Sequence, residues 1–102
     1  MMLYHLSERW LGQRVTLAPR IPRDRAPFED RRVRRICVAP TVQGCLLALR
    51  GCFYNRGVWW IYATSGVDAV EPISVPDASE TGERWLLHPT EMVCVRRITI
   101  ST

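Results

Sequence analysis

The sequence predicts an α+β fold, with about six short, mostly antiparallel strands and one clear helix in a single small domain, residues 1–102. Several segments of strand length are continuously apolar or alternate between polar and apolar residues, which is typical of buried and half-buried strands. Only residues 42–50 clearly place apolar side chains at helical spacing. A chain of 102 residues has the length of one domain with a modest core.

The strand predictions follow the apolar and β-branched runs along the chain. Residues 58–63 are the strongest candidate, and we expect this strand to be central because both of its faces are apolar. Residues 70–75 form a broken strand, which Pro72 and Pro76 confine to a sheet edge. The remaining predicted strands are residues 3–6, 14–17, 35–39, 84–87 and 92–100.

The predicted helix has a recognisable start and end. Thr41 is a good N-cap because its hydroxyl can accept a hydrogen bond from the first turn, and Gly51 follows the last helical residue. A single helical turn is also predicted after the first strand, with Ser7 as its cap and Gly12 as its stop.

The positive charge consists of arginine alone and is unevenly distributed. The chain has fourteen basic residues, all Arg, against ten acids, for a net charge of +4. Residues 1–57 carry a balance of +7 and residues 58–102 one of −3. Eight Arg lie in the segment 14–35, which includes a long Pro/Arg-rich loop predicted over residues 19–32.

This arginine-rich segment is the predicted site for a partner. We expect it to contact an anionic protein or nucleoprotein surface, since clustered positive charge attracts such partners. The alternative is that the acidic residues of the second half of the chain neutralise these arginines within the fold. The candidate binding residues are Arg20, Arg23, Arg25, Arg31, Arg32, Arg34 and Arg35.

Several other functional classes are not expected. The sequence has no apolar run long enough to span a bilayer and no secretory signal at its start, so we expect a cytoplasmic protein without a membrane role. The four Cys lack metal-site spacing, which predicts free thiols and no metal site. Sequence-specific nucleic-acid binding is not expected, because no helix-turn-helix, zinc-finger or aromatic RNA-binding pattern occurs. The cysteines are Cys37, Cys45, Cys52 and Cys94.

The order of the segments is similar to that of a known group of proteins. A Tyr4–Ser7 opening is followed by a Pro-rich loop, the strand-to-helix passage of residues 35–49, and then Thr81-Gly82-Glu83-Arg84-Trp85. This order resembles a family of small uncharacterised bacterial and phage proteins. It also resembles the compact ADP-ribosyltransferases that inactivate rifampin, whose first strand carries a Tyr-His pair.

The resemblance to the transferases implies a split-sheet fold, NAD as the cofactor if the protein is catalytic, and two catalytic residues. His5 would hold the NAD ribose, and Glu83 would be the acid that supports the oxocarbenium-like transition state. Position 37, where the family has an aromatic residue that stacks on nicotinamide, is Cys. The competing candidates for the acid are Asp68, Asp77 and Glu80.

Three functions remain as hypotheses. The favoured one is a non-catalytic phage or mobile-element protein that binds and inhibits a host factor, for example a defence system such as CRISPR. The second is an ADP-ribosyltransferase-like enzyme, or a binder of NAD or ADP-ribose. The third is a structural component of a phage particle.

Overall fold

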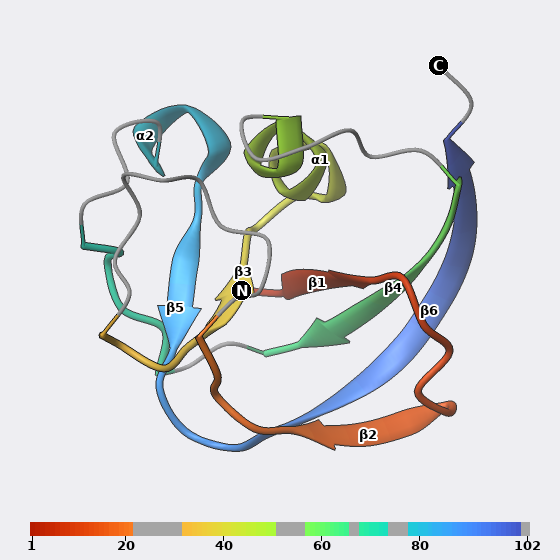
Figure 1. The fold of residues 1–102 in the computed structure, drawn as a ribbon, viewed down its shortest axis with the longest axis horizontal. Helices are drawn as coiled ribbons and strands as arrows, with labels where there is room; N and C mark the ends of the chain where they lie inside the picture. The colour runs from red at the N-terminus through yellow and green to blue at the C-terminus, as the bar shows by residue number, and fades with distance from the viewer. Residues whose placement is uncertain (22–31, 51–56, 66–67, 74–77, 101–102) are drawn as a thin grey trace.

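The fold consists of two antiparallel sheets and two helices (Figure 1). The computed structural model describes residues 1–21, 32–50, 57–65, 68–73 and 78–100. Within these ranges the predicted α+β class is confirmed, with six strands and two helices. The elements are β1 (Leu3–Ser7), β2 (Arg14–Leu17), β3 (Ile36–Val38), α1 (Val42–Arg50), β4 (Gly57–Thr64), α2 (Ala78–Thr81), β5 (Arg84–Leu86) and β6 (Thr90–Ile100).

The larger sheet has the strand order β1-β4-β6-β2, and each neighbouring pair is antiparallel. β4 is therefore an inner strand, as its two apolar faces predicted. A β-bulge interrupts its pairing with β6, because Ile61 lies opposite Arg96 whereas Tyr62 lies opposite Cys94. The extra residue, Val95, bends the long β6 strand, which Figure 1 shows as a curved ribbon.

The smaller sheet pairs β3 with β5 and packs against the larger sheet. The core cluster takes residues such as Leu3, Tyr62 and Met92 from the larger sheet. Ile36 and Leu86 are among those it takes from the smaller one. Burying each such side chain contributes roughly 1.5–3 kcal/mol, so this contact between sheets is the principal source of stability.

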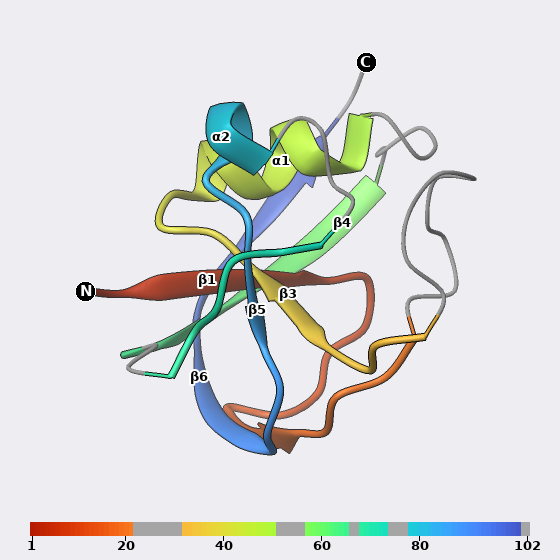
Figure 2. The same cartoon turned by 90° about the vertical axis from the view of Figure 1, so that its left-hand side faces the viewer.

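α1 confirms the predicted helix and its cap. The backbone N–H of Gly44 donates to the Thr41 hydroxyl oxygen at 2.9 Å, which satisfies a donor in the first turn. α1 lies beside the short helix α2 (Figure 2), and a side chain at Gly44 would collide with the Thr81 carbonyl oxygen. The predicted stop, Gly51, lies outside the described residues.

The helical turn predicted after β1 is wrong. The Tyr62 hydroxyl accepts the N–H of Leu11 at 2.9 Å and donates to the Gly12 carbonyl at 2.8 Å. Ser7 bonds instead with the backbone of Arg9 through its hydroxyl. The connection to β2 is therefore not helical. Its backbone N–H and carbonyl groups bond with side chains, whereas in a helical turn they would bond with each other.

The predicted strand over residues 70–75 is reduced to one bridge. Val70 exchanges two backbone hydrogen bonds with Trp85, of 2.8 and 2.9 Å, and the described residues 71–73 are not in a strand. Pro72 lacks an N–H, which prevents a regular ladder there. Residues 74 and 75 are outside the described ranges.

Further expectations concern the long loop, the cysteines and membranes. The predicted loop 19–32 lies mostly outside the described residues, which resume at Arg32. Cys37, Cys45 and Cys94 are free thiols, and Cys52 is not described. Among the described residues no helix has the length and apolar character needed to cross a membrane, and no cluster of metal-ligating side chains occurs.

Candidate functional site

His5 lies in the middle of β1 and connects it to β3. Its ring Nδ1 donates to the backbone carbonyl of Cys37 at 2.9 Å, and a carbonyl can only accept, so this nitrogen carries the proton. Burial lowers the pKa of His5, and the positive charge of Arg20 acts in the same direction, whereas the bond to Cys37 opposes both. The ring is therefore neutral near neutral pH and is used as a link between strands.

Glu83 is held in the interior just before β5. Its side chain is only 7% exposed, and its carboxylate accepts the indole N–H of Trp85 at 2.8 Å. Its backbone N–H donates to the Thr81 hydroxyl at 3.1 Å. Gly82 allows the chain to turn here, with a φ of 77° that favours glycine. The carboxylate thus supports a buried tryptophan, a structural task.

Arg35 is a core residue. It is 1% exposed, its guanidinium lies 4.2 Å from the ring centroid of Trp85, and its Nη1 donates to the Val33 carbonyl at 2.9 Å. One indole thus receives a cation on its face and offers its N–H to the carboxylate of Glu83. Arg35 is one of the residues predicted to bind a partner, but in the structure it is stacked on Trp85 and buried.

Cys45 of α1 lies close to this region but is not a reactive thiol. Its sulfur donates to the backbone carbonyl of Tyr4 at 3.2 Å. Burial raises the pKa of Cys45 to about 12, and the negative charge of Glu83 acts in the same direction. A thiol in this state is a poor nucleophile.

The structure does not join the two predicted catalytic residues by a hydrogen bond within the described residues. The charged side chain that acts on His5 is Arg20, and no hydrogen bond joins His5 to Glu83 in the part of the chain that is described. Of the competing acids, Asp68 and Glu80 are exposed, whereas Asp77 lies outside the described residues. These positions therefore do not indicate a cleft in which the imidazole of His5 and one of the described candidate acids face each other.

A small pocket lies elsewhere, between the end of β4 and the start of β6. It has a volume of about 190 Å³, and its lining includes Ser65, Asp68 and His88. Neither His5 nor Glu83 lines it. The described hydrogen bonds do not connect Ser65, Asp68 and His88 into a relay, so the pocket lacks the geometry of a nucleophilic triad.

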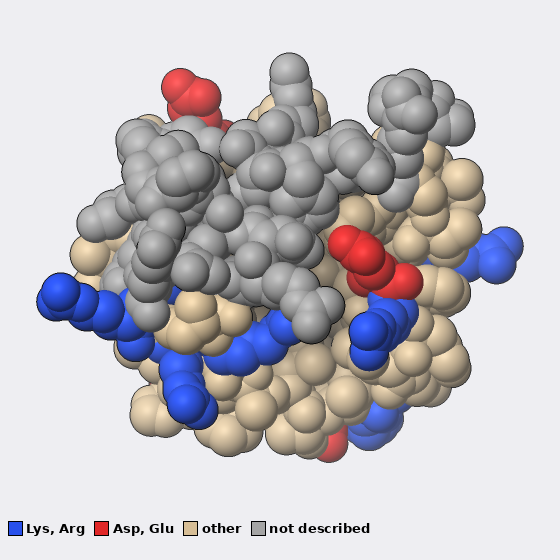
Figure 3. Space-filling view, viewed as in Figure 1, with Lys and Arg blue, Asp and Glu red and all other residues tan. Residues whose placement is uncertain are grey.

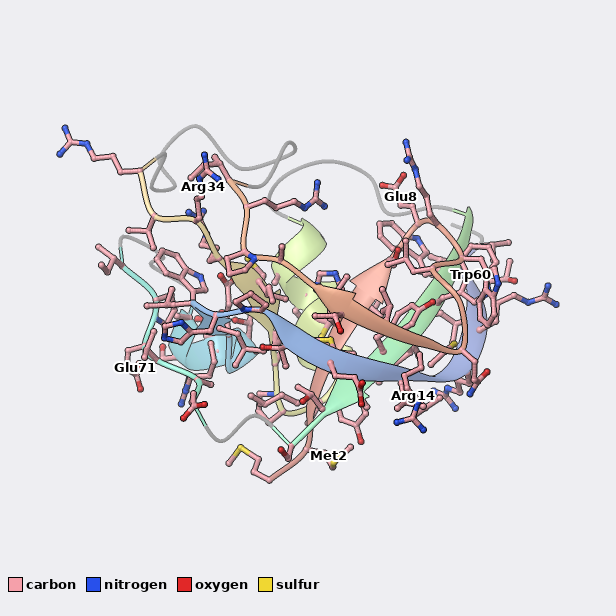
Figure 4. All side chains as sticks on the ribbon, turned by 90° about the horizontal axis from the view of Figure 1, so that it is seen from below. Met2, Glu8, Arg14, Arg34, Trp60 and Glu71 are labelled. Atoms are coloured by element: carbon pink, nitrogen blue, oxygen red, sulfur yellow. The ribbon has the colours of Figure 1, made fainter. Side chains whose placement is uncertain are left out.

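Three predicted binding residues, Arg20, Arg32 and Arg34, are exposed, and we call them the basic rim. The backbones of Arg20 and Arg35 exchange hydrogen bonds of 3.1 and 2.9 Å, so the backbone of Arg20 lies one residue away from that of Arg34 although the two are far apart in sequence. Figure 3 shows basic side chains spread from left to right across the lower half of this face, and Figure 4 shows Arg34 towards one end of the molecule. Arg23, Arg25 and Arg31 lie outside the described residues.

Two of the three rim arginines, Arg20 and Arg34, are not neutralised by an acid in the described part of the chain. The ion pairs there join Arg14 to Glu91 at 3.2 Å and Arg84 to Glu71 at 3.6 Å. Neither Arg20 nor Arg34 forms an ion pair with a described acid. The positive charges of these two arginines are therefore not offset by a described acid.

Sequence reasoning missed one exposed aromatic pair. Trp10 packs on Trp60 with the ring centroids 6.4 Å apart, and Trp10 remains 53% exposed. A signal was present, because Trp10 lies in a short connection where few apolar partners adjoin it in sequence.

Comparisons with protein families, with curated proteins and with solved structures found no match for this chain.

Proposed function

We propose that this protein is a non-catalytic binding protein whose basic rim contacts an anionic protein or nucleoprotein surface. The observation that carries the proposal is the backbone pairing of Arg20 with Arg35, which brings the backbones of the exposed Arg20 and Arg34 close together. Neither of these two arginines forms an ion pair with a described acid. Arginine suits this role because its planar guanidinium forms paired hydrogen bonds with carboxylate or phosphate groups.

The positions of the predicted catalytic residues support binding over catalysis. A residue that holds a ribose needs an exposed polar group, but His5 is engaged with Cys37 and partly enclosed. A carboxylate that stabilises a cationic transition state must face the substrate, whereas Glu83 faces the Trp85 indole inside the fold. Both side chains have a structural explanation that requires no substrate.

The biological setting comes from the sequence resemblance. In this proposal the protein is encoded by a phage or mobile element, and it inhibits a host factor by occupying that factor's anionic surface. A defence complex such as a CRISPR effector has such surfaces, both acidic and nucleic-acid-bound. Inhibition requires no catalytic group on this chain, in keeping with the structural roles of His5 and Glu83.

Capture from a bacterial host lysate, with matched charge-reversal variants, tests this proposal. Arg20→Glu/Arg34→Glu and Arg9→Glu/Arg14→Glu change the net charge equally, and all four residues are exposed. We expect the wild type and the second variant to capture the same partner and the first variant to lose it. Retention of that partner by Arg20→Glu/Arg34→Glu would contradict a role for the rim.

A further inference from the structure

Within the described residues, one side of β6 has no strand partner over its C-terminal half. β2 pairs with β6 only as far as Val93, and Gln13 then bonds with the backbone of Cys94 through two hydrogen bonds, of 2.8 and 3.0 Å. From Arg96 to Ile100, β6 pairs with β4 on one side, and no strand of the described chain pairs with the other. We call Arg96–Ile100 the open edge.

An open edge offers unpaired backbone N–H and C=O groups in a row. Such a row binds an extended segment of another chain by strand addition, in which backbone hydrogen bonds provide affinity and side chains provide selectivity. Five residues are as long as an ordinary strand. The backbone of β6 is fixed in the right conformation already, because β4 pairs with it along the whole edge.

An aromatic pair lies one strand away from the open edge. Trp60 is the direct cross-strand neighbour of Arg97, and Trp10 packs on Trp60 while exposing half of its own surface. The Tyr62 hydroxyl holds the two residues that follow Trp10 in place. An exposed tryptophan with a fixed position is a typical anchor at protein interfaces.

The charges at the open edge indicate what kind of segment it accepts. Arg96 and Arg97 are exposed, and neither forms an ion pair with a described acid. A second copy paired on this edge would bring the arginines of both copies close together, which is unfavourable. A segment with carboxylates would pair with them instead. Glu8 is also exposed at this end of the molecule (Figure 4), but the arginines outnumber it.

We propose that the open edge of β6 binds an extended, acidic segment of a partner protein as an added strand. Carboxylates of the segment pair with Arg96 and Arg97, and an apolar side chain packs on Trp10. The site is separate from the basic rim, because Arg34 and Trp60 lie towards different ends of the molecule (Figure 4). This inference therefore stands or falls independently of the proposed function.

A synthetic peptide that repeats Glu-Glu-Val-Val is the probe, because consecutive Glu residues face both sides of a sheet, as Arg96 and Arg97 do. Hydrogen exchange read by NMR is the measurement. We expect the peptide to slow exchange of the outward-facing amides of Arg96–Ile100 by at least about tenfold, as strand addition requires. The same peptide with N-methylated backbone amides should not protect them, because it cannot complete the ladder. Arg96→Glu/Arg97→Glu should weaken peptide binding at least about tenfold.

Three results would overturn the inference. They are the absence of protection at about millimolar peptide, equal binding of the N-methylated peptide, and unchanged affinity in Arg96→Glu/Arg97→Glu. Protection that grows with protein concentration without peptide would show that a second copy occupies the edge, which also contradicts the proposal. Arg20→Glu/Arg34→Glu is the matched control and should bind the peptide as the wild type does.

Discussion

The indole N–H of Trp85 donates to the Glu83 carboxylate across 2.8 Å, and both side chains are buried. The sequence resemblance implies a catalytic role for Glu83. This contact gives Glu83 a structural role instead, because its carboxylate is the acceptor for a buried indole. Its partner indole also carries the guanidinium of Arg35 on its face, 4.2 Å from the ring centroid. A cation and a carboxylate are thus accommodated inside a small domain by one aromatic ring.

Removal of the Glu83 carboxylate should destabilise the fold. Glu83→Ala leaves the buried indole N–H of Trp85 without its acceptor, which should lower the free energy of unfolding by about 1–3 kcal/mol in urea denaturation. Glu83→Gln should cost less, because its amide oxygen can still accept. Glu80→Ala, at an exposed position, is the control and should stay within about 0.5 kcal/mol. A Glu83→Ala variant as stable as the wild type would show that the contact is unimportant.

Stability should fall as the pH is lowered through the ordinary range of histidine. The pKa of His5 is lowered in the folded state, so below about pH 6.5 the unfolded chain takes up a proton that the folded chain does not. Unfolding should become easier by up to about 1.4 kcal/mol at a pH one unit below the histidine reference pKa. His5→Asn keeps a donor for the Cys37 carbonyl and removes the titration, so its pH dependence should be flatter.

The control for this pH effect is His88→Asn, because His88 is exposed and distant from His5 in sequence. Urea denaturation at several pH values compares the three proteins. Parallel pH profiles for the wild type and His5→Asn would contradict the assignment of His5 as a buried neutral ring.

The Tyr62 hydroxyl should stabilise the connection between β1 and β2. Tyr62→Phe loses hydrogen bonds to the backbones of Leu11 and Gly12, which should lower the free energy of unfolding by about 1–3 kcal/mol. Tyr4→Phe is the matched control, since the Tyr4 hydroxyl forms no hydrogen bond to a described residue. An equal effect of the two substitutions, measured by thermal or urea denaturation, would rule out a special role for this contact.

NAD and ADP-ribose should not bind. Calorimetry with either ligand at about millimolar concentration should give no heat beyond dilution, because His5 and Glu83 already have partners within the fold. Heat that disappears in His5→Ala, with the variant shown to be folded, would instead favour the transferase-like hypothesis.

The elements that sequence patterns predicted correctly depend on local information. α1 has its cap at Thr41 and its apolar spacing within one short segment, and β4 has two apolar faces that indicate an inner strand. The four-residue helix α2 is too short to produce a periodic signal.

The features that sequence patterns did not predict depend on distant residues. The turn after β1 is decided by Tyr62, fifty-one positions beyond the Leu11 backbone that it binds. Arg35 is buried because Trp85, far along the chain, offers its ring face. The charge pattern indicated the arginine-rich segment but not which of its arginines are exposed. The structure pairs the backbone of Arg20 with that of Arg35, and only Arg35 of these two is buried.

The affinity of a purified captured partner for the wild type and for the two charge-reversal variants tests the central claim most directly. We expect Arg20→Glu/Arg34→Glu to weaken binding by at least about tenfold, and added salt to weaken wild-type binding, because the rim acts through exposed charge. Arg9→Glu/Arg14→Glu, the matched control, should not weaken this rim contact. Equal affinity of Arg20→Glu/Arg34→Glu and the wild type at low salt would contradict the proposed function.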